Sequence, residues 1–275
     1  MKKLTFFKMS GSGNDFIIID NRNSVIDESS LKSFIRNVCR RKMSVGADGL
    51  ILIENSDSAD FKWHYYNADG GRAEMCGNGA RCAARFAFMN KIAGPDMSFV
   101  TDAGIVHAQV AGDKVKVKMT DPSELRHDYI IKLKDGSLTV SSVNTGVPHV
   151  VVMMESIDNV DVVGLGREIR LHKKFAPAGT NVNFITKVKN GAFSIRTYER
   201  GVEDETLACG TGSIASALVT AFKFKAGSPL NVITRSGGIL TIYYNEENGR
   251  FHDIYLEGDA RIIYKGQLWE DAWRY

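Results

Sequence analysis

The sequence predicts an α/β (α+β) protein of two domains related by a pseudo-twofold axis, each a mixed, curled sheet around a central helix. Two observations lead to this prediction. Strand-like and helix-like hydrophobic patterns alternate along the chain, and the sequence matches itself when it is shifted by 133 positions. A chain of 275 residues is long enough for two domains that each bury a core of their own.

The internal match rests on four landmarks that keep the same offset. They are the pairs Gly13 and Gly146, Gly46 and Gly179, Cys76 and Cys209, and Thr101 and Thr234. Helical heptads or low-complexity sequence do not produce such a match, and the period is far longer than that of a solenoid repeat. The sequence therefore indicates a duplicated domain.

In the first half, apolar runs and alternating patterns predict strands, and apolar spacings of three and four predict helices. In chain order we expect a strand at 15–20, a helix at 31–41, strands at 50–54 and 61–67, a helix from Cys76 to about residue 89, and strands at 107–110 and 114–119. The short polar connection between the last two strands predicts a hairpin.

The second half repeats this order. We expect a strand at 149–154, a helix at 163–172, strands at 182–186 and 191–199, a helix after Cys209, and strands at 231–235, 239–244 and 251–258. The halves are expected to meet near Asp121-Pro122, and the final segment is expected to return to the first half as a closing strand. The predicted domains are therefore 1–120 plus about 262–275, and 121–261.

Composition and charge argue against several classes of protein. The net charge is a mild +3 without a long Lys/Arg run, so nucleic acid is not an expected partner. No run of about 18 apolar residues predicts a membrane span, and the polar start of the chain does not resemble an export signal. The four cysteines form no CxxC pair and no zinc pattern with histidine, so we expect free thiols in a reducing cytoplasm, without a metal.

Two of the cysteines, Cys76 and Cys209, each precede a Gly-X-Gly turn and an apolar, helix-like stretch. At a helix N-terminus the dipole favours thiolate over thiol, and the free N–H groups form a binding site for an anion. If both elements face one cleft, one thiolate can take a proton from the carbon beside a bound carboxylate while the opposite thiol protonates the other face. The result is inversion at that carbon, with the backbone amides stabilising the developing charge and no cofactor required.

Other interpretations of the cysteines stay open. A free cysteine is commonly a small buried apolar residue, which is our interpretation of Cys39 and Cys82. Cys76 and Cys209 could instead form a disulfide, which a cytoplasmic location disfavours, or a dithiol redox switch. The chain could also be a non-catalytic protein that binds an anion or senses redox state through its thiols. Among enzymes, the alternative is a racemase of another amino acid. The residues do not say which cysteine acts as the base for which stereoisomer.

At these residues the chain resembles the diaminopimelate epimerase family, which uses two cysteines and no cofactor. The similarity spans nearly the whole chain, through "SGSGNDFIIID", "VGADGL", "YNADGGRAEMCGNGARC", "GTNVNF" and "YERG" followed by "ETLACGTGS". The proline racemase group resembles the second cysteine element but not the first. The resemblance implies the interconversion of LL- and meso-diaminopimelate, in lysine and peptidoglycan precursor biosynthesis, by a cytoplasmic homodimer.

The resemblance also assigns roles to individual residues. Cys76 and Cys209 match the acid/base pair, Glu199 a supporting carboxylate, and His149 a histidine near the thiols. The residues that match substrate contacts are Asn14, Asn67, Gly77, Asn78, Asn181, Glu199, Arg200, Gly210 and Thr211. A bidentate guanidinium suits the distal carboxylate of the substrate, and asparagines can bind ammonium and carboxylate groups alike.

Each of these side chains also has an ordinary structural interpretation. Asn14 and Asn181 could serve turns, Glu199 and Arg200 could form a surface ion pair, and His149 could be a hydrogen-bonded core residue. We interpret three nearby acids, Asp69, Asp102 and Glu205, as turn or capping residues.

The chain departs from the family pattern at three places. Val147 stands where many members have asparagine, Gly49 stands where some have glutamine, and the 201–208 loop is one residue longer than usual. The longer loop is expected to bring Glu203 and Asp204 to the rim of the cleft. These departures put individual substrate contacts in doubt, while both cysteines remain in place.

Overall fold

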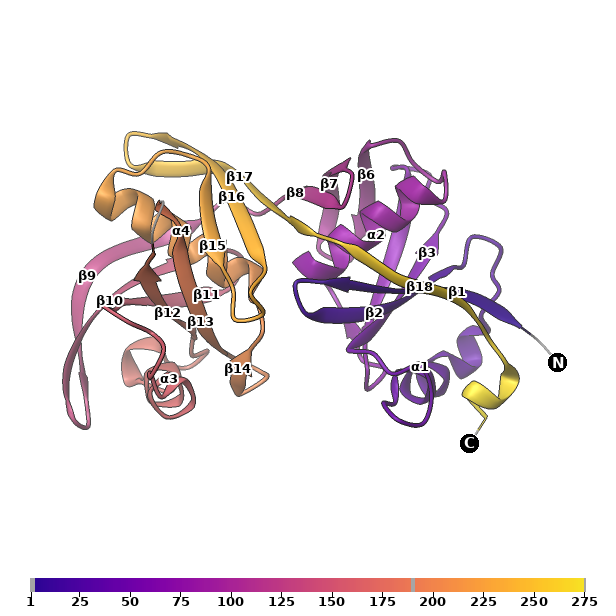
Figure 1. Cartoon of the computed structure of the whole chain (residues 1–275), viewed down its shortest axis with the longest axis horizontal. Coiled ribbons are helices and arrows are strands. Elements are labelled where there is room, and N and C mark those ends of the chain that lie inside the picture. Colours follow the sequence, from indigo (N-terminus) through magenta and orange to yellow (C-terminus); the bar gives the residue numbers. More distant parts are fainter. Residues whose placement is uncertain (1–2, 189–190, 275) are drawn as a thin grey trace. The chain divides into compact units, whose positions relative to one another are not determined.

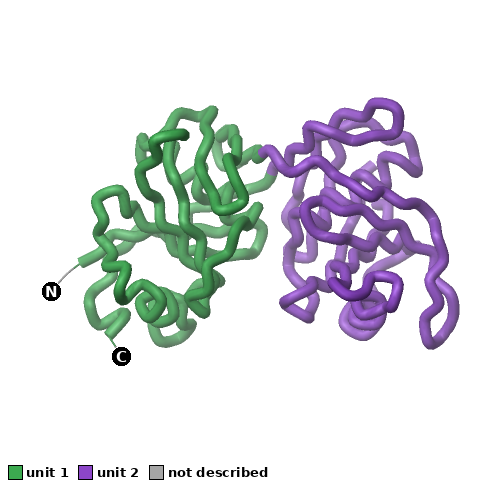
Figure 2. The backbone as a smooth tube through the Cα atoms, turned by 180° about the vertical axis from the view of Figure 1, so that it is seen from behind, with its two compact units in different colours: residues 1–117, 258–275 green, residues 118–257 purple. Residues whose placement is uncertain are grey.

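The computed structural model describes residues 3–188 and 191–274. The chain divides into two compact units, which Figure 2 colours separately. Unit 1 contains residues 1–117 and 258–275, and unit 2 contains residues 118–257. No helix within the described residues is long and apolar enough to cross a membrane.

Unit 1 is a mixed sheet with one buried helix and one outer helix (Figure 1). Its elements are β1 (Leu4–Gly11), β2 (Asn14–Asp20), η1 (Glu28–Ser30), α1 (Leu31–Cys39), β3 (Gly49–Glu54), β4 (Phe61–Asn67), β5 (Arg72–Ala73), α2 (Gly77–Met89), β6 (Asp96–Thr101), β7 (Gly104–Ala111), β8 (Lys114–Lys118), β18 (Arg261–Leu268) and η4 (Glu270–Ala272). Strand β2 runs parallel to β3, and β4 runs parallel to β6, whereas β1–β2, β3–β4, β6–β7 and β7–β8 are antiparallel.

The core of unit 1 surrounds α2. Small residues, Ala80, Ala83, Ala84 and Ala87, are buried along this helix, so its backbone can approach β1, β2, β3 and β7 closely. A second apolar cluster lies between the sheet and α1, and it includes Leu268 from the C-terminal strand. That strand, β18, pairs antiparallel with β1, which confirms the prediction of a closing strand.

Unit 2 has the same construction around α4 (Figure 1). Its elements are β9 (Ser123–Leu133), β10 (Gly136–Asn144), β11 (Pro148–Met153), α3 (Val162–Arg170), η2 (Lys173–Phe175), β12 (Asn181–Lys187), β13 (Phe193–Glu199), β14 (Asp204–Thr206), α4 (Gly210–Phe224), β15 (Leu230–Ile233), β16 (Ile239–Glu247) and β17 (Arg250–Asp259). Helix α4 is buried from Gly212 to Ala221 and packs against β10, β11, β12, β13, β15 and β16.

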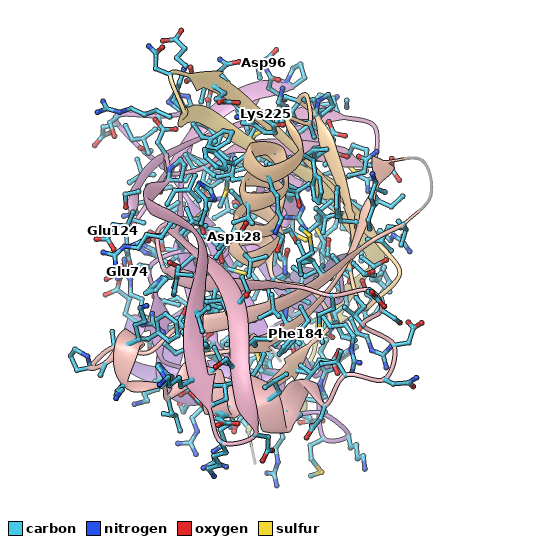
Figure 3. The ribbon with its side chains drawn as sticks, turned by 90° about the vertical axis from the view of Figure 1, so that its left-hand side faces the viewer. Glu74, Asp96, Glu124, Asp128, Phe184 and Lys225 are labelled. Atoms are coloured by element: carbon cyan, nitrogen blue, oxygen red, sulfur yellow. The ribbon has the colours of Figure 1, made fainter. Side chains whose placement is uncertain are left out.

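A second apolar cluster of unit 2 lies beneath α3 and contains Phe184 of β12. In Figure 3 Phe184 lies in the interior of the unit, whereas Glu124 and Asp128 lie along the outer strand β9. Unit 2 therefore buries apolar residues on both faces of its sheet, one set against α4 and the other against α3.

The duplication predicted from the sequence recurs in the strand pairings. In unit 2, β11 runs parallel to β12 and β13 runs parallel to β15, as β2 and β3, and β4 and β6, do in unit 1. The antiparallel pairs β10–β11 and β12–β13 likewise repeat β1–β2 and β3–β4. The pairing of β18 with β1 has its counterpart in β9 with β10. Each unit is thus a mixed sheet around a central helix, as expected.

Two helices end earlier than predicted, and several strands were missed. Helix α1 ends at Cys39 because Arg40 adopts an extended conformation, and α3 ends at Arg170 because His172 caps the short helix η2. The sequence patterns gave no prediction for β1, β6, β9 or β10. The predicted strand at 191–199 begins at Phe193, and residues 189–190 lie outside the described residues.

Candidate active site

Cys76 lies at the head of α2 in unit 1. Its backbone is extended, with φ −146° and ψ 114°, and its Sγ accepts a hydrogen bond from the N–H of Gly79 at 3.4 Å. Cys76 is therefore the N-cap of the helix, with a sulfur where serine or aspartate commonly places an oxygen. The first N–H groups of a helix have no partner within it, so those of Gly77 and Asn78 are available to an anion.

A chain of side-chain hydrogen bonds supports this helix end. Asp48 accepts from Nδ2 of Asn14 at 3.1 Å, and Oδ1 of Asn14 accepts from Nδ2 of Asn78 at 2.6 Å. Oδ1 of Asn78 in turn accepts from the Arg81 guanidinium at 2.8 Å. The structure thus brings the predicted residues Asn14 and Asn78 into direct contact.

Cys209 occupies the equivalent position at the head of α4 in unit 2. Its backbone is also extended, and its Sγ accepts from the N–H of Gly212 at 3.3 Å. The thiol lies 3.5 Å from Oγ1 of Thr211, whose carbonyl oxygen accepts from the hydroxyl of Thr145. Cys209 is buried, whereas Cys76 is half-buried. The amides of Gly210 and Thr211 are placed as those of Gly77 and Asn78 are in unit 1.

His149, at the start of β11, is fully buried in unit 2. Its Nδ1 lies 3.1 Å from Nδ2 of Asn183, an amide that also donates to the carbonyl of Val150. Since an amide nitrogen can only donate, Nδ1 accepts and the proton of the neutral ring is on Nε2. That nitrogen is buried without a hydrogen-bond partner among the described residues. Burial, followed by the charge of Arg200, lowers the pKa of His149 to about 3, so the ring is neutral at pH 7.

Asn181 holds the backbone around the predicted carboxylate-binding residue. Its Nδ2 donates to the carbonyl of Pro148 at 3.1 Å, and its Oδ1 accepts from the backbone N–H of Arg200 at 2.9 Å. The Arg200 guanidinium donates to the carbonyl of Ala178 at 3.2 Å. The side chain of Asn181 is therefore engaged with backbone groups of two distant segments, and because it lies in β12 it does not serve a turn.

In the part of the chain that the structure describes, no ion pair joins Glu199 to Arg200. The surface ion pair considered as an alternative for these two residues is therefore not observed. Burial raises the pKa of Glu199. A half-buried carboxyl with a raised pKa is suited to proton transfer.

Asn67, at the end of β4, is exposed, and its Oδ1 accepts from the hydroxyl of Tyr65 at 3.0 Å. Within the described residues, no hydrogen bond joins Asn67 to Asn14 or to Asn78. The position of Gly49, beside it across the sheet, admits no side chain, because a Cβ there would lie 2.5 Å from the carbonyl oxygen of Tyr66.

Of the three nearby acids, Asp69 and Asp102 lie in turns as predicted, whereas Glu205 was wrongly expected to do so, because it lies in β14. The carboxylate of Asp69 accepts from the N–H of Gly71, and Asp102 also forms an ion pair with Arg72. Glu205 makes two hydrogen bonds of 2.7 Å to the guanidinium of Arg196. In the longer loop, Glu203 contacts Arg170 and the hydroxyl of Tyr198, which ties the loop to α3.

The other two cysteines are buried, as predicted. Burial raises the pKa of both Cys39 and Cys82 to about 12, so neither thiol ionises near neutral pH. All four cysteines are free thiols. Within the described residues, no group of three or more His, Cys, Asp or Glu side chains is placed to hold a metal ion.

Sequence patterns missed the groups that lie behind the first cysteine helix. Arg81 is fully buried, and Ser12 and the carbonyl of Asp259 accept hydrogen bonds from it. Arginine on a helix is usually solvent-exposed, so its side chain was not considered. The sequence does place Arg81 among the small residues of the predicted helix, close to Ala80 and Ala83, and a charged side chain among small residues could have indicated burial.

Comparison with known proteins identifies relatives of this chain. The family model described as diaminopimelate epimerase matches residues 6–125 and 141–263. The diaminopimelate epimerase of Aquifex aeolicus (strain VF5) is 46% identical over 285 residues, covering 99% of this chain and 100% of the relative. That of Hydrogenobaculum sp. (strain Y04AAS1) is also 46% identical, covering 95% and 97% respectively.

Solved structures with low sequence identity share the fold. A phenazine biosynthesis protein of the PhzF family from Bacillus anthracis superimposes with a TM-score of 0.76 at 16% identity, covering 98% of this chain and 100% of the other. A probable proline racemase from Agrobacterium radiobacter K84 gives a TM-score of 0.70 at 16% identity, covering 97% and 93%. At these identities the likeness concerns architecture alone.

Proposed function

Because the chain belongs to the diaminopimelate epimerase family, we propose that it interconverts LL- and meso-diaminopimelate by proton transfer at one α-carbon, between Cys76 and Cys209. The enzyme is an isomerase of amino-acid metabolism, and the substrate places the reaction in lysine and peptidoglycan precursor biosynthesis. The α-hydrogen leaves as a proton to one thiolate, the electron pair passes toward the carboxylate, and the opposite thiol returns a proton to the other face. The two sulfurs exchange charge states in the step, so the protons balance.

One observation carries the proposal: each unit has a cysteine as the N-cap of its central helix. Both sulfurs accept a hydrogen bond from the third residue of the cysteine turn, at 3.4 Å in unit 1 and 3.3 Å in unit 2. A sulfur in this position lies beside N–H groups that favour its thiolate and bind a carboxylate. The amides of Gly77, Asn78, Gly210 and Thr211 would hold the carboxylate at the reacting carbon and stabilise the charge that develops on it.

The remaining predicted residues supply support and substrate contacts. Glu199 is proposed to assist proton transfer, because burial raises its pKa. His149 is neutral at pH 7, so we propose that it supports a thiol as a hydrogen-bonding group and not as a cation. Arg200 is proposed to bind the distal carboxylate, and the side chains of Asn14, Asn67 and Asn181 to contact the amino and carboxylate groups or position the residues that do.

The experiment is proton exchange from solvent. LL-diaminopimelate is incubated with the enzyme in deuterium oxide, and deuterium at the α-carbons is followed by mass spectrometry and NMR. We expect deuterium at one α-carbon together with formation of the meso isomer, and loss of both in Cys76→Ala and in Cys209→Ala. Full exchange and epimerisation by either variant would exclude the two-thiol mechanism.

Cys82→Ala is the matched control, because Cys82 lies on α2 with Cys76 but is fully buried. It should retain exchange if the loss in Cys76→Ala comes from the thiol and not from damage to the helix. A panel with proline and other amino acids tests the alternative substrate. Turnover of proline without turnover of diaminopimelate would replace the proposed substrate while leaving the chemistry in place.

We also propose that the enzyme is a cytoplasmic homodimer. The four free thiols support a reducing compartment. Exposed apolar side chains on and after β18, namely Ile263, Tyr264 and Trp269, support a contact with a second copy. Light scattering coupled to gel filtration gives the mass in solution, and a monomer at micromolar concentration would contradict the dimer.

A further inference from the structure

The charge of Arg81 in unit 1 is buried without a counter-ion. Its side chain is fully buried, and every hydrogen bond that it makes within the described residues is to a neutral acceptor. The acceptors are the carbonyl oxygens of Gly77 and Asp259, both at 3.3 Å, and the side chains of Ser12 and Asn78, both at 2.8 Å. No ion pair joins Arg81 to a carboxylate in residues 3–188 and 191–274. Burying a cation without an anion is costly.

The charge of Asp259 acts on Arg81, but its carboxylate forms an ion pair with Arg261 and makes no hydrogen bond to Arg81 within the described residues. Oδ1 of Asp259 accepts from the N–H and the hydroxyl of Ser12, and its Oδ2 forms an ion pair of 2.7 Å with Arg261. Only the backbone carbonyl of Asp259 contacts Arg81. The groups that interact electrostatically with Arg81 are Cys76 and Cys82 on α2 and Asp259 on β17. Asp48 reaches this cluster through Asn14 and Asn78, as described above.

Of these groups, Cys76 is suited to carry the compensating charge. Cys82 is fully buried and stays protonated, with a pKa of about 12. Cys76 is half-buried at the helix N-terminus, and Arg81 donates to the carbonyl of Gly77, the residue that follows it. The helix dipole and the guanidinium therefore both act on the same sulfur with the same sign.

Unit 2 lacks this cation. The position 133 residues after Arg81 is Ile214, which is fully buried on α4. Thr145 and Thr211 stand at the positions equivalent to Ser12 and Asn78, and the Thr145 hydroxyl donates directly to the Thr211 carbonyl. The two cysteine turns thus share their backbone geometry, but the helix of unit 1 carries a buried guanidinium where the helix of unit 2 carries an apolar side chain.

From this asymmetry we propose that Arg81 is a positioning residue that favours the thiolate at Cys76, so that the resting enzyme holds Cys76 as the base and Cys209 as the acid. The assignment rests on the two-thiol function proposed above. The epimer whose α-hydrogen faces Cys76 then meets the enzyme in its resting form. The reverse reaction needs Cys76 protonated and Cys209 ionised, which is the less populated form.

The experiment measures the ionisation of each thiol without any substrate. The full-length enzyme is treated with iodoacetamide between pH 5 and 10, and the rate of alkylation at each cysteine is followed by peptide mass spectrometry. The midpoint of each pH profile reports thiolate formation independently of how accessible the thiol is. We expect a lower midpoint for Cys76 than for Cys209, and an equal or higher midpoint for Cys76 would overturn the proposal.

Arg81→Met removes the charge while keeping a long apolar stem. It should raise the Cys76 midpoint by about one pH unit, which lowers alkylation of Cys76 at pH 7 about tenfold, and leave the Cys209 profile unchanged. Arg85→Met is the matched control, because Arg85 lies one turn further along α2 and contacts the carbonyl of Ala260. Equal shifts in both variants, or no shift in Arg81→Met, would contradict the role of Arg81.

Arg81→Lys provides the test if Arg81→Met does not fold. It keeps the charge and loses the fork of donors, so the Cys76 midpoint should stay within a few tenths of a unit of that of the unaltered enzyme. A rise as large as that expected for the methionine variant would show that charge is not the cause. Because alkylation needs no diaminopimelate, these outcomes are independent of whether diaminopimelate is the substrate.

Discussion

At the scale of single residues, the surroundings of a thiol decide whether it can react. Cys39 and Cys82 are buried within helices, whereas Cys76 and Cys209 cap helices with their sulfurs facing backbone N–H groups. Desolvation disfavours a thiolate, and a helix N-terminus favours it. Four chemically identical side chains therefore divide into two buried thiols that stay protonated and two helix-capping thiols that we propose are reactive.

This division predicts a pattern of chemical modification. At pH 8 in the native enzyme, iodoacetamide should modify Cys39 and Cys82 more than about 100-fold more slowly than in urea, because a thiol of pKa about 12 is almost entirely protonated. Peptide mass spectrometry of timed samples measures all four sites at once. Equal native and denatured rates at Cys82 would show that this thiol is not buried in solution.

His149 predicts a dependence of stability on pH. Its pKa is lowered from 6.5 to about 3 in the folded chain, so between these values the unfolded chain binds a proton that the folded chain does not. Above pH 6.5, His149 therefore does not lower the free energy of unfolding. Below pH 6.5, it lowers the free energy of unfolding by about 1.4 kcal/mol for each pH unit of acidification. Urea unfolding at pH 7, 6 and 5 measures the slope.

His149→Asn is the comparison variant, because its amide oxygen can accept from Asn183 as Nδ1 does. The variant is expected to be less stable at pH 7, since it leaves a cavity. Its free energy of unfolding should nevertheless depend less steeply on pH between 7 and 5 than that of the unaltered enzyme. Parallel profiles would mean that His149 titrates normally in the folded state.

At the scale of elements, the two cysteine turns tolerate different substitutions. A Cβ at Gly212 would lie 2.3 Å from Oδ1 of Asn183, whose amide is fixed by hydrogen bonds to His149, Val150 and Thr197. A Cβ at the equivalent Gly79 would meet the side chains of Ile51 and Trp63 at 3.3 Å. The first contact requires a hydrogen-bonded group to move, and the second requires a small adjustment of apolar packing.

We therefore expect Gly212→Ala to destabilise the protein by about 1–3 kcal/mol, and Gly79→Ala by less. Gly212→Ala should also lower epimerase activity, since the added Cβ would lie 3.2 Å from Sγ of Cys209 and displace the N–H that donates to this sulfur. Thermal unfolding and the exchange assay measure the two effects. If Gly79→Ala were the more damaging of the pair, the packing described for Asn183 would be wrong.

Elements with a strong local pattern could be predicted from the sequence, and those that depend on tertiary contacts could not. The residues of β3, β4 and the cysteine helices carry their signal in runs of apolar or small residues. Strand β9 alternates, with Leu125, Tyr129, Ile131 and Leu133 on its more buried face, but His127 on that face and an exposed Ile130 on the other weaken the pattern in the sequence. In β1, a buried Lys8 interrupts the pattern, and its burial depends on an ion pair of 2.8 Å with Asp15 in β2.

The candidate site divides in the same way. The two cysteines were found because the duplication marks them, and the turn glycines follow from them. Arg81, Asn183 and Ser12 were not found, because their importance lies in being buried beside other polar groups. A sequence gives the identity of such a residue, but its burial depends on the packing of several distant segments.

At the scale of the whole molecule, the two units differ in how the chain builds them. Unit 2 is one continuous segment that contains two apolar clusters of its own. Unit 1 needs both ends of the chain, because β18 pairs with β1 from Leu4 opposite Leu268 to Ser10 opposite Arg261. Leu268 and Trp273 also contribute to the cluster around α1. In unit 2, the strand that pairs with β10 is β9, which directly precedes it in the chain. In unit 1, the strand that pairs with the equivalent β1 is β18, which comes from the C-terminal end of the chain.

This difference predicts how fragments fold. Residues 118–257 alone should show a cooperative urea transition, whereas residues 1–117 alone should not, because β1 then lacks its partner and the core lacks Leu268. The N–H of Ala260 donates to the carbonyl of Asp113 at 3.0 Å, so the two parts of unit 1 lie close together where unit 2 departs. A flexible linker of about eight Gly and Ser residues between 117 and 258 is long enough to rejoin them. That joined protein should regain a cooperative transition by circular dichroism, and an equally cooperative transition in residues 1–117 alone would show that β18 is not required for unit 1 to fold.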